Sequence, residues 1–380
     1  MKGINTPGQA LDCGGVTSFA PSRGGVSHLA VPALVRKRNH NDVPFLSRRW
    51  GMIPKSSIVI LGLACLICIT IGCTRPVSIK NTVSKTTANP TIEIACITKM
   101  QTDEHWGAVK SGARLAASEA RITVEFYAPM SEADFQKQYQ YFLEAIQKKV
   151  DAILISPSDE AMLAPLVAQA KAQGIVVVSI DSGFSKAEVD FHISSDNFKL
   201  GEDAARAVLA LQPRPIKASI IGSLAESLNM QERIAGIVSV LDDYPESSIS
   251  MDFSGAEENI AKEITSRLLG SESGTNVVFA LEENSAHGVA DTLISMGSDT
   301  SLVFIAFGSS KQQISLLEKD IIDLLVVENS FNMGYLGIMK AVELIKGEKP
   351  ETRNLKTDYA LITKDTLRTP ENQRLAFPVY

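Results

Sequence analysis

Residues 151–182 read DAILISPSDEAMLAPLVAQAKAQGIVVVSIDS. This stretch opens with an aliphatic run at 151–155, closes with a β-branched run at 174–180, and has a segment of helical length between them. A strand, a helix and a strand in this order predict two neighbouring parallel strands joined by a crossover helix. Gly174 suits the exit from that helix, and Pro165 is expected in its first turn.

The same alternation of strands and helices continues on both sides of this stretch. Further strand-like runs are found at 91–98, 121–127, 190–194, 217–222, 248–253, 276–280, 302–307 and 323–327. Helical stretches separate these runs, which argues for parallel α/β sheets. Because the two series span about 290 residues, too many for one core, we expect an α/β protein with two parallel-sheet lobes.

The composition excludes several classes of protein. Of the 380 residues, 45% are hydrophobic and 21% are charged, as in an ordinary globular chain. The net charge of −6 gives no basic field that would direct the chain to nucleic acid. Five cysteines are too few for a dense disulfide framework. The sequence has no phosphate-binding glycine loop, zinc-protease motif or serine-hydrolase elbow, so we predict no catalytic residue, cofactor or metal.

The N-terminal region is predicted to carry an export signal. Residues 56–73 read SSIVILGLACLICITIGC without a charge and follow Lys55, a pattern typical of a secretory signal. The end of this run resembles a bacterial lipoprotein signal, so we expect cleavage before Cys73 and lipidation of its thiol. An uncleaved anchor helix is the alternative, since about 18 apolar residues just span a bilayer.

The segments around this signal are not expected to fold. Residues 1–51 are rich in Gly, Pro, Ser and Arg and read as an unstructured leader, or lie before the true start if that start is Met52. Residues 52–72 are then the lipoprotein signal peptide, and residues 73–90 form a polar linker. The protein is therefore expected outside the cytoplasmic membrane and anchored to it by a lipid.

Polar and aromatic residues follow the carboxyl ends of the predicted strands, where open parallel sheets bind ligands. The positions are 99–106, 181–182, 253, 282–283, 308–309 and 328–329. Carboxylates accept hydrogen bonds from hydroxyls strongly, and aromatic rings cover C–H surface. These positions, rich in carboxylates, amides and aromatics, form the candidate ligand site.

Several segments carry a family resemblance when they are read in chain order. Besides residues 151–182, they are IACITKMQTDEHWGAVKSGARLAA at 94–117, HISSDNFKLGEDAA at 192–205, MQERIAGI at 230–237, VVFALEENSAHG at 277–288 and FNMGYLGIMKAVELIKGEKP at 331–350. Together they resemble the ribose/galactose-type periplasmic binding proteins. The resemblance implies the type I periplasmic binding fold, an α/β architecture of two Rossmann-like parallel-sheet lobes joined by a three-strand hinge. One lobe would comprise residues 91–195 plus 329–357, and the other residues 196–328 plus 358–380.

The resemblance also implies a function. It points to a solute-binding protein, not an enzyme, that acts as a monomer and delivers a monosaccharide, amino sugar or polyol to an ABC permease. A ligand-sensing co-receptor for a membrane kinase or chemoreceptor uses the same fold and stays open as an alternative. A lac-type repressor is disfavoured, because a signal and a linker stand where its helix-turn-helix would be.

Three aromatic residues match positions that contact sugar in the family. Trp106 stands where an aromatic ring stacks on the sugar, His105 where a second ring often lies, and Phe253 where the second lobe supplies another. Trp106 and Phe253 also suit a hydrophobic core, and that alternative stays open.

Polar ligand contacts are also carried over from the family. Lys99 and Asp103 match positions that meet sugar hydroxyls, and Asp181 matches an aspartate that accepts hydrogen bonds from them. Asp103 also suits the N-cap of the following helix, a role compatible with ligand contact. Asn229 and Arg233 are expected to shape the start of a helix instead of touching ligand.

Five candidate positions depart from the ribose pattern. Ser182 and Gln231 stand where the ribose-binding proteins have arginines. Glu282 replaces an asparagine of that pattern, Glu328 replaces a glutamine and Gly308 replaces an aspartate. Ribose itself is therefore not the expected ligand. Glu282 also suits a helix start, and Glu328 a hinge.

The expected pocket has an excess of negative charge. Asp103, Asp181, Glu282 and Glu328 face only Lys99 as a certain cation, and clustered carboxylates are costly without donors. We therefore hypothesise that the ligand brings donors or positive charge, as an amino sugar, a polyol or an amine does.

Overall fold

The computed structural model describes residues 91–212, 215–270, 274–297 and 302–377, which belong to one compact unit, Ser84–Tyr380. The leader, signal, linker and lipidation predictions concern residues 1–90 and lie outside the described residues. Within the described ranges, no helix is both long enough and apolar enough to cross a membrane.

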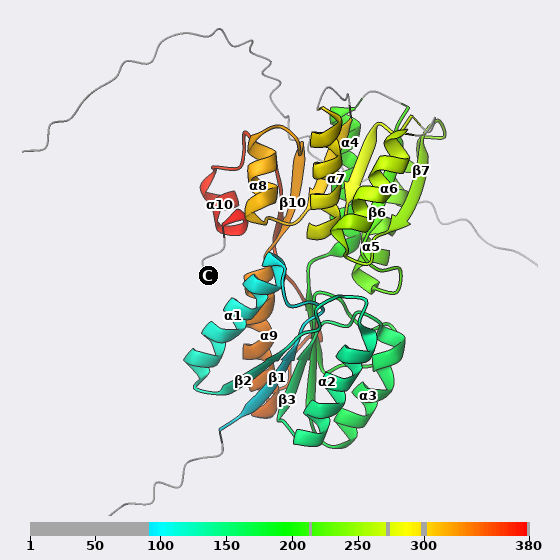
Figure 1. Ribbon diagram of the computed structural model, residues 1–380. Coiled ribbons are helices and arrows are strands. Elements are labelled where there is room, and N and C mark those ends of the chain that lie inside the picture. The colour runs from blue at the N-terminus through cyan, green and yellow to red at the C-terminus, as the bar shows by residue number, and fades with distance from the viewer. Residues whose placement is uncertain (1–90, 213–214, 271–273, 298–301, 378–380) are drawn as a thin grey trace, which may run out of the picture. The chain divides into compact units, whose positions relative to one another are not determined.

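Six strands form the first sheet in the order β11-β5-β4-β3-β1-β2, and all of its pairings are parallel. They are β1 (Glu93–Ile97), β2 (Thr123–Tyr127), β3 (Ala152–Ile155), β4 (Val176–Ile180), β5 (Phe191–Ser194) and β11 (Asn354–Lys356). Helices α1 (Glu104–Ala120) and α9 (Ser330–Ile345) cover one face (Figure 1). Helices α2 (Phe135–Lys148) and α3 (Glu160–Ala172) cover the other. This sheet and its helices are lobe 1.

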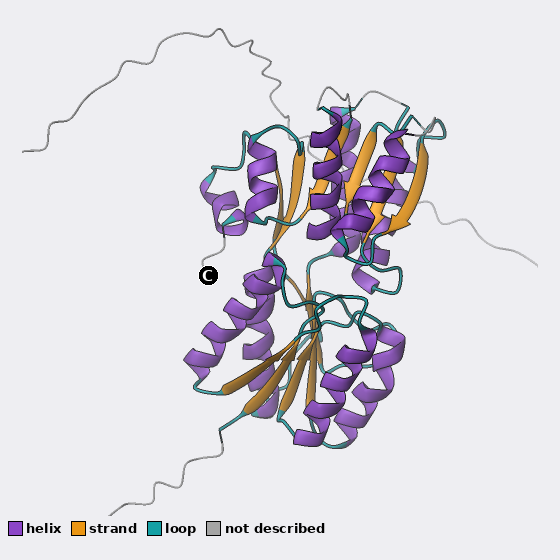
Figure 2. Cartoon of the chain, in the orientation of Figure 1, coloured by secondary structure: helices purple, strands orange, loops and turns teal. Residues whose placement is uncertain are grey.

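Six strands form the second sheet in the order β12-β10-β9-β8-β6-β7, and only β12 is antiparallel to its neighbour. They are β6 (Lys217–Gly222), β7 (Ser248–Phe253), β8 (Val277–Ala280), β9 (Val303–Phe307), β10 (Leu324–Glu328) and β12 (Tyr359–Ile362). Helices α4 (Asn197–Leu211) and α5 (Leu228–Leu241) pack on one face. The other face carries α6 (Glu258–Gly270), α7 (Glu283–Met296), α8 (Lys311–Glu318) and α10 (Pro370–Ala376). Figure 2 shows the alternation of strands and helices in this lobe 2.

The chain passes between the two sheets three times, after β5, after β10 and after β11. Hydrogen bonds join these crossings. The Thr357 N–H donates to the Ser194 carbonyl over 2.9 Å, and the Asn329 N–H donates to the Asp358 carbonyl over 3.1 Å. The predicted α/β fold of two parallel-sheet lobes is confirmed.

One local prediction was wrong. Helix α3 begins at Glu160 because the Asp159 carboxylate accepts from two N–H groups of its first turn. Pro165 therefore lies inside the helix and not in its first turn, so one backbone hydrogen bond is missing there. Gly174, with a φ of 79°, follows the helix as expected.

Helices α1 and α9 approach each other closely through glycine. A Cβ on Gly112 would lie 2.0 Å from the Phe331 carbonyl oxygen, and one on Gly334 would lie 1.9 Å from the Val109 carbonyl oxygen. Only glycine permits this approach. The contact holds together two helices that begin beside the cavity described next.

Candidate ligand-binding cleft

A cavity of about 460 Å³ is lined by residues from both lobes. The residues are Lys99, Asp103, His105, Trp106, Glu132, Asp181, Ser223, Asn229, Met230, Arg233, Glu282, Glu283, Phe307, Gly308 and Glu328. Most of them follow the carboxyl end of a strand, where ligands bind in parallel sheets.

The cavity brings together seven of the ten candidate residues, namely Lys99, Asp103, His105, Trp106, Asp181, Glu282 and Glu328. The other three do not line it. Ser182 is buried, and its N–H donates to the Ser156 hydroxyl over 3.4 Å. Gln231 is exposed and donates to the Ala225 carbonyl over 2.7 Å, while Phe253 is 39% exposed at the end of β7.

Asp181 is the centre of a buried polar network. It follows β4 in a left-handed conformation with a φ of 57°, which aspartate tolerates better than most residues. Its carboxylate lies 3.4 Å from the Lys99 ammonium and accepts from the Ser156 hydroxyl over 3.0 Å. The Asn229 amide of lobe 2 donates to both of its oxygens, over 3.0 and 3.1 Å. The network therefore joins the two lobes.

The surroundings keep Asp181 ionised. Burial by itself would raise the pKa of this carboxyl, but Lys99, His105 and Arg233 lower it to about 2. Nε2 of His105 lies 4.0 Å from Oδ1 of Asp181. The cavity therefore holds a fixed negative charge that can accept hydrogen bonds from a ligand.

Arg233 is a second buried cation, which the sequence analysis did not assign to the site. Its guanidinium donates to Asn197 Oδ1 and to the Leu281 carbonyl, both over 2.9 Å, and pairs with Glu328 over 2.5 Å. It also lies over the Phe307 ring, 5.2 Å from the centroid. The side chain does more than shape the start of α5, because it reaches the ends of β8 and β10 and lines the cavity.

The charge balance of the cavity differs from the expected one. Lys99 pairs with Asp181 and Arg233 pairs with Glu328, so two of the four expected carboxylates are neutralised. The excess of negative charge lies instead around two helix starts.

Asp103 and Glu282 are the N-caps of α1 and α7. The Asp103 carboxylate accepts from the Trp106 N–H over 2.7 Å. The Glu282 carboxylate accepts from the Asn284 and Ser285 N–H groups, each over 2.7 Å. The expected capping role of Asp103 is confirmed, and the helix starts favour both negative charges.

Two further carboxylates lie beside these caps. Glu132, in the loop after β2, is 7% exposed, and its Oε2 has no hydrogen-bond partner. Glu283, at the start of α7, accepts from the Glu104 N–H over 3.0 Å and so links the lobes. We call Asp103, Glu132, Glu282 and Glu283 the acidic cluster.

Burial and mutual repulsion favour protonation in the acidic cluster. Burial, followed by the charge of Glu283, raises the pKa of Asp103 well above its usual range. Burial is also the largest cause that raises the pKa values of Glu282 and Glu283 to about 7. No group of His, Cys, Asp and Glu side chains in the described ranges is arranged to hold a metal ion.

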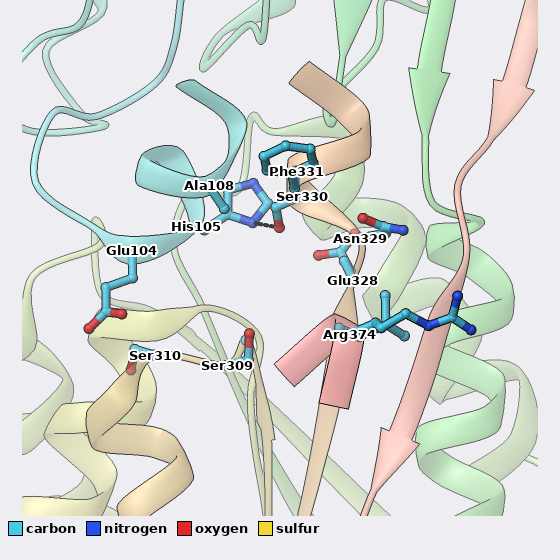
Figure 3. Close-up of a pocket in the computed structure, with 12 residues that line it drawn as sticks. Glu104, His105, Ala108, Ser309, Ser310, Glu328, Asn329, Ser330, Phe331 and Arg374 are labelled. Atoms are coloured by element: carbon cyan, nitrogen blue, oxygen red, sulfur yellow. Dashed lines mark hydrogen bonds between the residues drawn. The ribbon is translucent and has the colours of Figure 1, made fainter. Parts of the chain in front are cut away.

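His105 lies between this cavity and a neighbouring one of about 430 Å³, since it lines both. Figure 3 shows the neighbouring cavity, with His105 joined to Ser330 by a hydrogen bond of 2.8 Å between Nδ1 and Oγ. The imidazole meets the Trp106 ring edge-on, with centroids 4.7 Å apart. The indole is only 2% exposed and belongs to the hydrophobic core of lobe 1, so the core role left open for Trp106 is confirmed, while the residue also lines the cavity.

Three cavity residues that the sequence analysis did not assign to the site also follow the ends of strands. Glu132 follows β2, and Asn229 and Arg233 follow β6, so the rule for strand ends applies to their loops as well.

The comparisons with known proteins agree with this geometry. Residues 94–349 match the model of the periplasmic binding protein domain. The chain belongs to this family. The resemblance to sugar-binding proteins of the type I periplasmic fold is therefore confirmed.

Two relatives of this periplasmic binding protein carry the names of sugar-binding proteins. The ribose import binding protein RbsB of Bacillus subtilis is 25% identical over 221 residues, which cover 58% of this chain and 71% of that protein. The D-ribose/D-allose-binding protein of Pseudomonas aeruginosa is 24% identical over 271 residues, which cover 68% of this chain and 83% of that protein.

Solved structures give the same result. An ABC transporter solute-binding protein from Agrobacterium vitis with bound D-fucose has a TM-score of 0.72 and 27% identity, covering 75% of this chain and 100% of that one. A carbohydrate transporter solute-binding protein from Agrobacterium radiobacter with D-arabinose has a TM-score of 0.71 and 26% identity. The match covers 76% of this chain and 99% of that one.

Proposed function

We propose that this protein is an exported, lipid-anchored solute-binding protein that captures a small sugar between its lobes for uptake by an ABC permease. The observation that carries this proposal is the cavity itself, which is lined by Trp106 together with the buried charged residues Asp181 and Arg233. The bound sugars named for two structural relatives support the ligand class.

The cavity suits the two kinds of surface that a sugar presents. The indole of Trp106 and the ring of Phe307 cover C–H faces. Asp181 accepts hydrogen bonds from hydroxyls, while Lys99 and Arg233 donate to hydroxyl oxygens. A hydrogen bond to a charged group contributes about 1.5–3 kcal/mol, against about 1 kcal/mol for a neutral pair.

Ligand capture is coupled to contact between the lobes. The Lys99 ammonium of lobe 1 donates to Ser227 over 2.7 Å and to Asn229 over 3.1 Å in lobe 2. A sugar entering the cavity exchanges such contacts for its own hydroxyls and so bridges the two lobes. Closure then excludes water and strengthens each polar contact.

Delivery and anchoring complete the proposal. Lipidation of Cys73 would keep the protein at the outer face of the cytoplasmic membrane, where a permease can receive the ligand. The protein would act as a monomer, because each chain carries residues from both lobes around its own cavity. Sensing through a membrane kinase is the alternative. Deletion of the gene separates the two roles, because it abolishes uptake of the ligand in a transport role and abolishes only gene induction in a sensing role.

Calorimetry with the full chain, purified in mild detergent, tests the binding function. We expect one saturable site for at least one sugar in a panel of neutral and amino monosaccharides. Trp106→Ala should abolish the heat, whereas Phe198→Ala, at a 42% exposed aromatic on α4, should retain it. A folded protein that binds no sugar in the panel would contradict the proposal.

A further inference from the structure

The acidic cluster is charged differently from the rest of the cavity. Asp181 and Glu328 each have a basic partner within 4 Å, whereas no lysine or arginine of the described ranges pairs with a member of the cluster. Asp103 and Glu132 come from lobe 1, and Glu282 and Glu283 come from lobe 2. Contact between the lobes therefore gathers four carboxyl groups around the cavity, close enough to interact electrostatically.

Glu132 distinguishes this cluster from a set of helix caps. The other three carboxylates accept hydrogen bonds from backbone N–H groups, but Oε2 of the buried Glu132 meets no donor. A buried carboxylate oxygen without a donor is unfavourable. Since Glu132 lines the cavity, a ligand in the cavity can supply the donor that the protein does not.

We propose that the ligand is an amino sugar, whose protonated amino group binds among Asp103, Glu132, Glu282 and Glu283. The sugar ring lies against Trp106, and its hydroxyls face Asp181, Lys99 and Arg233. This inference rests on the proposed function, because it names the class of sugar for the same cavity.

An ammonium group explains how the lobes can close at neutral pH. Four carboxylates brought together repel one another, and a cation between them offsets that repulsion. Without a bound cation, burial raises the pKa values of Glu282 and Glu283 to about 7, so bound protons neutralise part of the negative charge of the acidic cluster. Binding of an amino sugar must then release protons, which binding of a neutral sugar does not require.

The ligand preference can be measured by calorimetry at pH 7 on the full chain in detergent. D-glucosamine and D-galactosamine are compared with D-glucose and D-galactose, with methylamine and calcium chloride as cations that lack the sugar ring. At least one amino sugar should bind tenfold or more tightly than its parent sugar. Titration in two buffers of different ionisation enthalpy should show proton release for the amino sugar.

Variants test whether the acidic cluster causes the preference. Glu132→Gln should weaken amino-sugar binding at least tenfold and bring the ratio to the parent sugar close to one, and Glu283→Gln is a second variant should the first fail to fold. Glu144→Gln, at an exposed carboxylate on α2, is the matched control and should change neither affinity.

The outcomes separate this inference from the proposed function. Parent sugars that bind as tightly as amino sugars overturn the inference and leave sugar binding intact. Methylamine or calcium that binds as tightly as the amino sugar also overturns it, because the ring then contributes nothing. If no sugar binds, the proposed function fails with the inference.

Discussion

The ammonium of Lys99 lies 3.4 Å from the carboxylate of Asp181, and both side chains are at most 3% exposed. Lys99 follows β1 and Asp181 follows β4, so two separate strands place the pair at the same edge of the sheet. Both residues also reach Asn229 of lobe 2. This pair links the stability of lobe 1 to the ligand cavity.

Removing the cation from this pair should destabilise the protein strongly. In Lys99→Met, Asp181 keeps a buried charge without its main partner, which costs about 3–5 kcal/mol. Chemical denaturation should show this loss in the free energy of unfolding. The control is Lys171→Met, which breaks a surface pair with Asp190 at 30% and 29% exposure and should cost at most about 1 kcal/mol. Equal losses in the two variants would refute the assigned role of the buried pair.

The acidic cluster should make stability depend on pH. The folded-state pKa of Glu282 is about 7 against an ordinary value of 4.5, so the folded protein binds more protons between these two pH values. Its contribution to the free energy of unfolding is therefore present below pH 4.5 and is lost as the pH rises toward 7, by on the order of 2 kcal/mol.

Thermal melts of the unliganded protein at several pH values check this dependence. Glu282→Gln should flatten the profile while it keeps an oxygen that can cap α7. Glu263→Gln, at an exposed site on α6, should leave the profile unchanged. Burial lowers the pKa of His192 to about 4, which acts on stability in the opposite direction, so the wild type is compared with the Glu282→Gln variant. A wild type that gains stability relative to Glu282→Gln from pH 5 to pH 7 would have the wrong sign.

Two glycines of α1 should respond oppositely to alanine. At Gly112 a Cβ would lie 2.0 Å from the Phe331 carbonyl oxygen, so Gly112→Ala must separate α1 from α9 at a cost of about 2 kcal/mol or more. At Gly107 a Cβ would meet nothing within 4 Å, so Gly107→Ala should be neutral or stabilise by about 0.5–1 kcal/mol. Denaturation midpoints of the two variants provide the measurement, and a similar effect at both sites would argue against close packing of α1 and α9.

Lipidation is predicted at Cys73. Cells that express the protein should incorporate a palmitate analogue into it, and Cys73→Ser should remove the label and leave the precursor unprocessed. Cys68→Ser, five residues earlier in the same apolar run, should label like the wild type. Labelling that persists in Cys73→Ser would indicate an anchor of another kind.

The sequence predicted the fold well because each lobe repeats a local pattern. Strand-length aliphatic runs and amphipathic helices are visible without knowledge of tertiary contacts, and parallel pairing follows from their alternation. Pro165 was misplaced because the cap at Asp159, not the proline, determines where α3 begins.

The candidate site was predicted only in part, and the reason is physical. The rule for strand ends found Asp181 and Trp106, since it needs only sequence order. It does not state which charges pair, because the contact between Arg233 and Glu328 depends on how α5 packs against β10. Glu132 was missed because its loop after β2 was not considered.

Intrinsic tryptophan fluorescence tests the central claim, sugar binding in the cavity, most directly. The chain has two tryptophans, Trp50 and Trp106, and Trp106 lines the cavity. Trp50 precedes the predicted cleavage site at Cys73, so Trp106 supplies the tryptophan emission of the processed protein. A sugar that binds should change this emission saturably in the wild type and should produce no change in Trp106→Phe. A saturable response that persists in Trp106→Phe, or calorimetric binding of a sugar without any change in Trp106 emission, would contradict a site at this cavity.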